Sequence, residues 1–321
     1  MDQNFRITSD FEQLDTYELN GKRVAVGFRP SGELHVGNLL SIGYAAVIAD
    51  ELNMELDLMC CDTDWSAHLH ENHRPENNRV MKLFYMRDCG CGEHENIAEH
   101  RVDEIRDFLE GLESETVDIE VKYLSNYRDE SYLQALRNVL NIIDEFDEIF
   151  GGGFRRRYRS PVAGVCSECG FSHAKGSAFS EECDELVHSC WSSECSQGFS
   201  STPLDESIGV YYLVDPVRDP GRDVAVHVFG GDYRDAEKGQ KTSKAVKVAR
   251  ITDLACGETP AYFLGPLIAD DGGKPLSKSK DTGETVTEID DLEKYGKELA
   301  GQIREWLSEE KRYIPETQIH Q

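Results

Sequence analysis

The chain has 321 residues, 39% of them hydrophobic, with 61 acidic and 34 basic side chains. Such a composition describes a globular chain with room for one large domain or two ordinary ones. The net charge of −27 disfavours wide binding to nucleic acid, because the phosphate backbone would meet a negative field. An acidic surface of this kind is typical of halophilic proteins, in which high salt screens the self-repulsion.

The sequence contains no run of about eighteen apolar residues, so no membrane span is predicted. Residues 1–6 have neither the pattern of a signal peptide nor that of a transit peptide, and we expect a cytoplasmic protein with no membrane partner. Its ten cysteines then need an explanation other than disulfides. One basic cluster, Arg155–Arg159, is either a solvated turn or a local contact for RNA.

The first half of the chain alternates between strand and helix patterns, which predicts an α/β fold with a parallel sheet and right-handed crossovers. In order, the predicted elements are a strand over 22–28, a helix over 35–52, a strand over 55–61, a helix over 94–112, a strand over 119–124 and a helix over 129–149. Gly151–Gly153 ends the last helix and marks a boundary.

The second half returns to the same alternation after a Ser/Gly/Cys-rich segment over 160–205. The predicted elements there are strands over 209–214 and 223–229, a helix over 235–250, a strand-like run over 261–268 and a helix over 288–311.

Two short-spaced cysteine pairs lie in the Ser/Gly/Cys-rich segment. Two such pairs on turns supply four thiolates at tetrahedral reach, as a structural Zn²⁺ site needs. Gly170 directly after the first pair suits the tight turn of such a site. The predicted Zn²⁺ ligands are Cys166, Cys169, Cys190 and Cys195.

The second pair has four intervening residues rather than two, which leaves other ligands open. The substitutes are Cys183, His173 and His188, and free thiols are the alternative to any metal site. Cys60, Cys61 and Cys256 lie in apolar contexts and are predicted to be core residues. Cys89, Cys91 and His94 form a Cys-x-Cys-x-x-His cluster, a weaker candidate for metal binding.

The segment Val26–Asn38 joins a strand, a turn at Pro30-Ser31-Gly32 and the start of a helix near His35. A glycine turn lets the backbone approach a ligand closely, and a helix N-terminus attracts anions. A distant segment, Pro275–Lys280, offers serine and lysine side chains after a glycine-rich approach. Alone, the first would be a helix cap and the second a solvated loop. Together they predict a nucleotide site in which cationic groups follow a leaving pyrophosphate.

These two segments resemble the signature motifs of the class I aminoacyl-tRNA synthetases. His35-Val-Gly-Asn38 is similar to their HIGH motif, and Leu276-Ser-Lys-Ser279 to their KMSKS motif. The archaeal-type class I lysyl-tRNA synthetases are nearest by pattern, since their opening Gly-x-x-Pro-Ser-Gly-x-x-His-x-Gly-Asn-Leu is matched from Gly27 to Leu39. The resemblance continues to about residue 290 through Cys91–His94, Ala98–His100, Tyr127, Tyr132, the cysteine pairs, Val214–Arg218 and Phe229–Tyr233.

The resemblance implies a Rossmann-like parallel sheet of the HIGH/KMSKS nucleotidyltransferase type with an inserted small zinc-binding module. It divides the chain into residues 1–153, the first half of the catalytic domain with a helical insertion; 154–207, the zinc-binding connective module; 208–287, the second half with the KMSKS-like loop; and 288–321, a C-terminal helix and tail. Synthetases of this type carry a large helical anticodon-binding region after the KMSKS loop. Only about forty residues follow that loop in this sequence, so direct reading of an anticodon is not expected.

Site residues are carried over by position. The implied catalytic residues are His35, Asn38, Lys278 and Lys280. The implied ATP-binding residues are Pro30, Ser31, Gly32, Gly37, Gly231, Asp232, Ser277 and Ser279. The implied substrate-binding residues are Arg29, Ser41, Asp64, Asp215, Arg218 and Tyr233. His35 and Asn38 would contact the ATP phosphates, Gly231 and Asp232 would hold the ribose, and Mg²⁺ would bridge the phosphates.

Three departures fall where the lysyl family reads its amino acid. Arg29 replaces a small polar residue, Ser41 replaces an acidic one, and Asp215-Pro-Val loses the tryptophan of Asp-Trp-Pro. An unpaired lysine ammonium in a closed pocket is costly, and a guanidinium beside it adds repulsion. We therefore expect an amino acid other than lysine, one with an extra carboxylate. Pro275 also stands where the KMSKS motif has a lysine, although Lys274 is adjacent.

The resulting functional hypothesis is an AMP-forming ligase that activates an amino acid with ATP and transfers it to tRNA or another acceptor, such as a carrier protein or a small amine. The alternative is a non-catalytic regulatory paralogue that binds ATP or an amino acid. Intact His35, Asp232 and Lys278 favour catalysis, whereas Ser41 and Pro275 favour the regulator.

Overall fold

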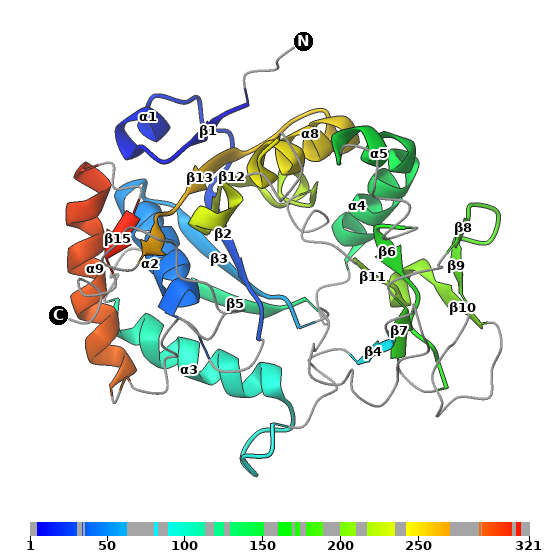
Figure 1. Ribbon diagram of the computed structural model, residues 1–321, viewed down its shortest axis with the longest axis horizontal. Helices are drawn as coiled ribbons and strands as arrows, with labels where there is room; N and C mark the ends of the chain where they lie inside the picture. The colour runs from blue at the N-terminus through cyan, green and yellow to red at the C-terminus, as the bar shows by residue number, and fades with distance from the viewer. Residues whose placement is uncertain are drawn as a thin grey trace.

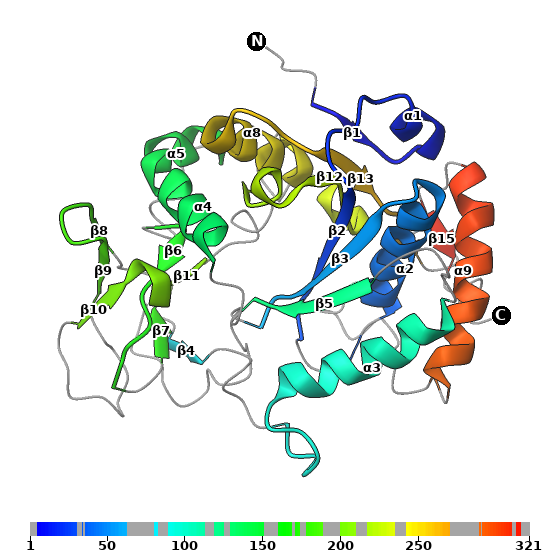
Figure 2. The same cartoon turned by 180° about the vertical axis from the view of Figure 1, so that it is seen from behind.

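The structure is a computed structural model, and its elements are shown from two opposite sides in Figures 1 and 2. It describes residues 5–30, 34, 36–62, 80–82, 89–112, 119–124, 129–150, 160–168, 171–173, 178–188, 200–209, 217–234, 242–269, 289, 291–309 and 313–315. No helix in these ranges is long and apolar enough to cross a membrane.

A parallel six-stranded sheet lies at the centre of the described structure, in the order β1-β13-β12-β2-β3-β5. Its strands are β1 (Ile7–Thr8), β2 (Arg23–Phe28), β3 (Glu55–Cys60), β5 (Ile119–Tyr123), β12 (Val224–Phe229) and β13 (Ala261–Leu264). Strands from both halves of the sequence are hydrogen-bonded side by side, since Val24 of β2 is in register with Val226 of β12. The expected α/β fold with a parallel sheet is thereby confirmed.

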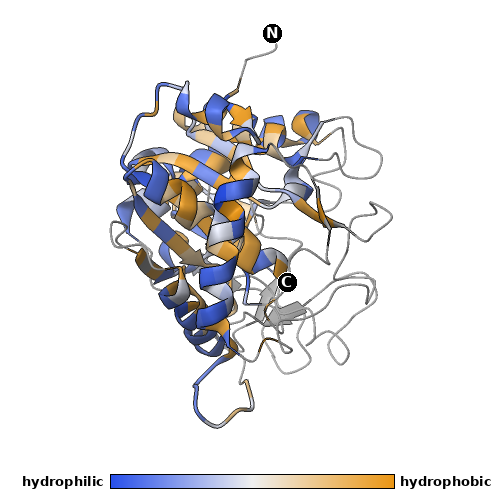
Figure 3. Ribbon diagram, turned by 90° about the vertical axis from the view of Figure 1, so that its left-hand side faces the viewer, coloured by the Kyte–Doolittle hydropathy of each residue, from blue (hydrophilic) through white to orange (hydrophobic). Residues whose placement is uncertain are grey.

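Helices pack on this sheet and on one another (Figure 1). They are α1 (Phe11–Asp15), α2 (Val36–Glu51), α3 (Ile97–Gly111), α4 (Glu130–Asn141), α5 (Phe146–Ile149), α8 (Lys244–Cys256) and α9 (Leu292–Ser308). The connection between β2 and β3 is α2, which is buried on nearly every side between the sheet and α9. The outer helices carry alternating hydrophobic and hydrophilic bands, as amphipathic elements do (Figure 3).

Two glycines let α3 and α9 cross at close range. A Cβ on Gly111 would lie 1.7 Å from the carbonyl oxygen of Glu293, and one on Gly296 would lie 2.3 Å from that of Phe108. Both distances are far below van der Waals contact, so only glycine fits at either position. This crossing fixes α9 against the helix layer that covers one face of the sheet.

Smaller ladders lie beside the main sheet. A three-stranded antiparallel sheet is formed by β8 (Ala178–Ser180), β9 (Glu185–His188) and β10 (Ser200–Pro203). Two-stranded ladders pair β4 (Val80–Lys82) with β7 (Phe171–His173), β6 (Val162–Ala163) with β11 (Ile208–Gly209), and β14 (Leu267–Ala269) with β15 (Tyr313–Pro315). Short 3₁₀ turns cover Ile143–Glu145, Leu204–Glu206, Pro220–Arg222 and Gly231–Tyr233.

Most predicted elements of the first half are confirmed within a few residues, and the exceptions have physical reasons. The helix predicted over 129–149 is broken at Ile142, because Phe146 and Phe150 turn inward and stack at 5.9 Å in the core beside α8. Residues 235–241 of the helix predicted over 235–250 lie outside the described ranges; within them α8 begins at Lys244, where Ser243 caps it, and runs to Cys256 before Gly257 ends it.

One strand prediction is corrected, and another is tested only at its first residue. Gly209, the start of the strand predicted over 209–214, lies in β11, which pairs antiparallel with β6, and residues 210–216 lie outside the described ranges. The run predicted over 261–268 is divided by Gly265-Pro266 into β13 and β14, because proline cannot continue a central strand. The proposed domain limits at 153, 207 and 287 stay predictions.

Candidate functional site

The strand order of the main sheet reverses between β2 and β12. From β2 the chain proceeds outward through β3 and β5, whereas from β12 it proceeds to the other side through β13. In open parallel sheets, ligands bind beyond the carboxyl ends of the strands at such a reversal. The segments that leave β2 and β12 there both carry predicted ATP-binding residues.

The first turns of α2 lie against the loop that follows β12. A Cβ on Gly230 would lie 3.5 Å from the Ser41 Oγ and 3.1 Å from the Asp232 Oδ1. The Ser41 hydroxyl donates to the backbone carbonyl of Gly37 at 3.0 Å. The structure therefore brings Gly37 and Ser41, predicted from one motif, close to Asp232, predicted from another nearly 200 residues away.

Gly231 brings a third segment to the same place. A Cβ on Gly231 would lie 2.7 Å from the Leu267 backbone nitrogen and 2.8 Å from the Gly265 carbonyl oxygen. Both are backbone atoms that cannot move aside cheaply, so this residue must be glycine for packing reasons alone. Gly265–Leu267 joins β13 to β14 and precedes the segment that contains the KMSKS-like motif.

A lysine that the sequence analysis did not single out holds Asp232. The Lys244 ammonium, at the start of α8, donates to the Asp232 Oδ2 at 2.6 Å and lies 5.3 Å over the Tyr233 ring. Tyr233 in turn stacks on Phe229 with ring centroids 4.2 Å apart. The carboxylate is thus held through one oxygen, while its other oxygen lies beside Gly230 and the α2 side of the loop.

The predicted substrate residues that the structure describes have different surroundings. Arg29 is exposed just past the carboxyl end of β2, followed by the buried Pro30. Arg218 is only 1% exposed, and its guanidinium lies 5.3 Å over the Tyr132 ring. A substrate would reach Arg218 only if that packing opened. Asn38 is half-buried on α2.

Several predicted site residues lie outside the described ranges. They are Ser31, Gly32, His35, Asp64, Asp215, Ser277, Lys278, Ser279 and Lys280 of the nucleotide and substrate sets, Cys169, Cys190 and Cys195 of the zinc set, and the Arg155–Arg159 cluster.

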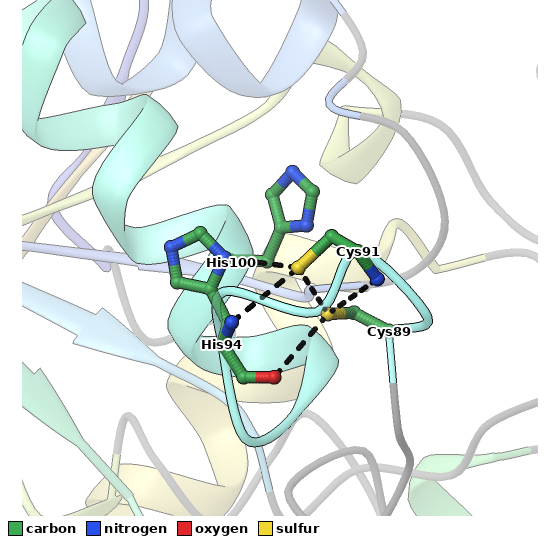
Figure 4. Close-up of side chains that lie close together, drawn as sticks. All are labelled: Cys89, Cys91, His94 and His100. Carbon is green, nitrogen blue, oxygen red and sulfur yellow. Dashed lines mark hydrogen bonds between the residues drawn. The ribbon is translucent and has the colours of Figure 1, made fainter.

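The structure gathers four metal-ligating side chains in the loop before α3 and on its first turn (Figure 4). They are Cys89, Cys91, His94 and His100, and their ligand atoms all lie within 4.8 Å of one another. The Cys91 Sγ lies 2.8 Å from the Cys89 Sγ and 3.2 Å from the His94 Nδ1. Two thiolates at about 2.3 Å from Zn²⁺ in a tetrahedral site are roughly 3.8 Å apart, so the sulfurs would separate slightly on binding.

Local sequence shapes this loop. Gly90 and Gly92, with φ of 76° and 81°, turn the chain on either side of Cys91. The backbone N–H groups of Glu93 and His94 both donate to the Cys91 Sγ at 3.4 Å. The Asn96 side chain caps α3 by accepting hydrogen bonds from the backbone N–H groups of Ala98 and Glu99, which fixes the loop to the helix.

Hydrogen bonds from Cys89 and from the backbone lower the pKa of the Cys91 thiol to about 6. The pKa of His94 is raised, first by its hydrogen bond to Cys91 and then by that to Asp103. Cys91 is thereby favoured as the thiolate, which is the form that binds metals.

One atom in this cluster indicates a missing partner. The His100 Nδ1 is buried and has no hydrogen-bond partner among the described residues. A buried ring nitrogen without a hydrogen-bond partner is costly, and the cost is removed when the nitrogen binds a metal ion as a ligand. Two cysteines and two histidines form a donor set that Zn²⁺ accepts in structural sites. The residues present therefore fit a metal ion.

The structure describes only some of the candidate ligands in the predicted zinc module. Cys166 is buried, and Cys183 is exposed in the turn between β8 and β9. His188, an alternative ligand, is buried with its Nε2 2.8 Å from the Thr202 Oγ1, so it links β9 to β10. Among the predicted core cysteines, Cys60 is buried as expected, whereas Cys61 and Cys256 are half-buried.

In the sequence His100 belongs only to the family-like segment Ala98–His100, and Asp103 belongs to no recognisable motif. The short spacing between His94 and His100 could have indicated His100 as a ligand, because a histidine on the first turn of a helix lies next to the loop that precedes that helix. Lys244 carried no comparable signal.

Comparison with known proteins places this chain in a family. A family model described as tRNA synthetases class I (K) matches residues 7–300. Lysine–tRNA ligase 1 of Methanosarcina acetivorans is 27% identical over 299 residues, and lysine–tRNA ligase of Methanosarcina barkeri is 26% identical over 301 residues. Each match covers 87% of this chain and 52% of the relative, so the chain spans about half the length of these curated relatives.

Solved structures of synthetases also align. Tyrosyl-tRNA synthetase of Archaeoglobus fulgidus, solved with L-tyrosine, covers 87% of this chain and 65% of its own at 14% identity, with a TM-score of 0.44. Tyrosyl-tRNA synthetase of Aeropyrum pernix covers 89% and 65% at 15% identity, with a TM-score of 0.41. Because the family model matches most of its length, the chain belongs to the tRNA synthetases class I (K).

Proposed function

We propose that this protein activates an amino acid with ATP to form an aminoacyl-adenylate, which it transfers to tRNA or another acceptor. The observation that carries the proposal is the meeting of the α2 start, the Gly230–Asp232 loop and the β13–β14 junction where the strand order reverses. Membership in a family of ATP-dependent ligases supports it. The acceptor is tRNA by family likeness, and a carrier protein or a small amine is the alternative.

In the proposed reaction, a carboxylate oxygen of the amino acid attacks the α-phosphorus of ATP, the bond to the β-phosphate bridging oxygen breaks, and pyrophosphate leaves. His35 and Asn38 position the phosphates, and Lys278 and Lys280 stabilise the departing charge. Asp232 accepts a hydrogen bond from a ribose hydroxyl through its Oδ1, because Lys244 donates to its Oδ2. Mg²⁺ supplies charge neutralisation between the phosphates when bound. Such a reaction is accelerated mainly by positioning and by electrostatic stabilisation.

We further propose that the amino acid is not lysine. Arg29 is exposed at the carboxyl edge of the sheet, and Ser41, where the family has an acid, uses its hydroxyl on Gly37. A guanidinium at this edge favours a substrate with a second carboxylate and repels an ammonium group.

A second candidate function is a non-catalytic regulator that binds ATP or an amino acid. Pro275 and Ser41, which depart from the family motifs, favour it. It differs from the enzyme in one measurable respect, since it would bind ATP without exchanging pyrophosphate.

Pyrophosphate exchange into ATP, measured with each of the twenty amino acids in molar KCl, tests these proposals. We expect exchange with one amino acid that is not lysine. Binding of ATP without exchange would support the non-catalytic regulator. Lysine-dependent exchange would contradict the proposal that Arg29 repels a lysine substrate.

Replacing Asp232 by asparagine is expected to raise the KM for ATP in this assay by about 5- to 10-fold, because the amide oxygen still accepts the ribose hydroxyl but lacks the charge that makes such a hydrogen bond roughly 1–1.5 kcal/mol stronger. Glu258→Gln is the matched control, because Glu258 is exposed and precedes the amino end of β13, at the opposite edge of the sheet. An unchanged KM in Asp232→Asn would remove Asp232 from the ribose site.

We also propose that Cys89, Cys91, His94 and His100 hold a structural Zn²⁺. Their convergence and the buried His100 Nδ1 support this site, whose ion would tie the loop to α3. The four-cysteine site at Cys166, Cys169, Cys190 and Cys195 remains a separate proposal. Elemental analysis of the purified protein tests both, with two equivalents of zinc expected if both are filled and one if only the cluster before α3 is. Less than half an equivalent would contradict both sites.

A further inference from the structure

Each histidine of the metal cluster has a carboxylate beside its outer nitrogen. The His94 Nε2 lies 2.9 Å from the Asp103 Oδ2, while its Nδ1 faces the Cys91 Sγ. The His100 Nε2 lies 3.5 Å from the Glu104 Oε1, while its Nδ1 is the buried atom without a partner. Both rings therefore present Nδ1 on the inner side and Nε2 to a carboxylate. They also stack, with centroids 4.8 Å apart.

Each carboxylate is itself held by an arginine. The Arg106 Nη1 donates to the Asp103 Oδ1 at 2.6 Å, and the Arg101 Nη1 donates to the Glu104 carboxylate at 2.5 Å. Both pairs are three residues apart on α3, a spacing that places side chains on the same face of a helix. The chain thus contains two relays of histidine, carboxylate and arginine on the first turns of one helix.

We propose that Asp103 and Glu104 are the positioning residues of the metal site. Asp103 accepts the Nε2 hydrogen of His94, and Glu104 lies within ion-pair distance of the His100 Nε2, so each ring keeps its Nδ1 lone pair directed at the ion. A metal-binding histidine commonly donates its other ring N–H to a carboxylate, and this bond fixes both its tautomer and its orientation. This inference rests on the proposed Zn²⁺ site.

Charge balance supports the assignment. Two thiolates neutralise a divalent ion, and the two neutral imidazoles add no charge. The Asp103–Arg106 and Glu104–Arg101 pairs are each neutral. The assembly thereby adds no net charge to a chain that already carries −27, so the carboxylates strengthen the ligands without adding repulsion.

The two relays differ in strength. The Asp103 contact is a hydrogen bond of ordinary length that reaches from the second turn of α3 back to the loop. The Glu104 contact is an ion-pair distance of 3.5 Å without a hydrogen bond, and it stays within the helix. Asp103 is therefore the more important of the two, because it alone fixes a ligand that belongs to the loop.

Titration of the metal-free protein with Co²⁺, followed by competition with Zn²⁺, tests the inference. Asp103→Ala is expected to weaken binding of either ion by about 10- to 100-fold, the usual effect of losing an outer partner. Asp103→Asn should lose less, because its amide oxygen still accepts the Nε2 hydrogen. Asp107→Ala is the matched control, since it removes the same charge from an exposed position one turn further along α3.

The Co²⁺ absorption spectrum provides a second readout. In Asp103→Ala the thiolate charge-transfer bands should persist, whereas the d–d bands should shift because the imidazole is no longer held. If Asp103→Ala matches the affinity and spectrum of the wild type and of Asp107→Ala, the inference fails while the metal site stands. If the wild type takes up neither ion, the metal site itself is wrong and the inference falls with it. Should Asp103→Ala fail to fold by circular dichroism, Asp103→Asn and Glu104→Gln decide.

Discussion

Replacing Cys91 by serine is expected to reduce the zinc content of the protein by one equivalent. Cys91 is the centre of the cluster, since its sulfur contacts Cys89 and His94 and accepts two backbone N–H groups. A serine hydroxyl is not ionised at neutral pH and is a poor ligand for Zn²⁺. The affinity loss should exceed the roughly 100-fold that removal of an outer partner costs.

Competition with a chromophoric chelator measures this loss, and Cys256→Ser is the matched control. Cys256 lies at the end of α8 and donates to the Val217 carbonyl, a bond that a serine hydroxyl can keep. An ion that binds only the folded state adds about 4 kcal/mol of stability when its free concentration is about 1,000 times its Kd. Removing the ion with a chelator should therefore lower the melting temperature of the wild type. Unchanged zinc content in Cys91→Ser would place the ion elsewhere, with the four-cysteine site as the first alternative.

Replacing Gly296 by alanine is expected to destabilise the fold by about 1–3 kcal/mol, the cost of forcing extra atoms into a packed interior. The new Cβ would lie 2.3 Å from the carbonyl oxygen of Phe108, so α9 would have to move away from α3. These two helices form the most extensive helix–helix contact among the described elements, and Leu299 and Ile303 of α9 belong to the core that covers the sheet.

Gly301 supplies the control on the same helix. A Cβ there would meet nothing within 4 Å, so Gly301→Ala should stabilise the protein by about 0.5–1 kcal/mol, because alanine loses less backbone freedom on folding. Urea unfolding of the two variants measures the difference. Equal stabilities would show that the helices separate without cost, which would contradict the close crossing.

Much of the fold could be predicted from periodicity. The strand at Arg23–Phe28 and the helices at Ile97–Gly111 and Leu292–Ser308 have strong patterns that local rules recognise. The break at Ile142 could not be predicted, because it depends on where Phe146 packs against α8. The strand Tyr313–Pro315 depends on pairing with Leu267–Ala269, a contact that its own three residues do not specify.

The candidate sites follow the same division. The family resemblance singled out Gly231 and Asp232, and their role in binding ATP stays a prediction, whereas the close backbone approach at Gly231 is a feature of the structure itself. Lys244 and Asp103 were missed because each acts through a partner that is distant or only loosely patterned in sequence. By sequence spacing, the four-cysteine module is a stronger metal-site prediction than the Cys-x-Cys-x-x-His cluster. Only the latter gathers its ligands within the part of the chain that the structure describes.

The pairing of β2 with β12 has a consequence for synthesis on the ribosome. Val24 and Val226 are neighbours in the sheet but about 200 residues apart in the chain. Because the ribosome adds about 5–20 residues per second, roughly 10–40 s pass between the synthesis of β2 and that of β12, which pairs with the β2 edge. During that interval an apolar strand, Val24–Phe28, has one unpaired side, which is a template for wrong pairing. The edge of β2 is therefore open to wrong pairing until the second half of the chain has been made.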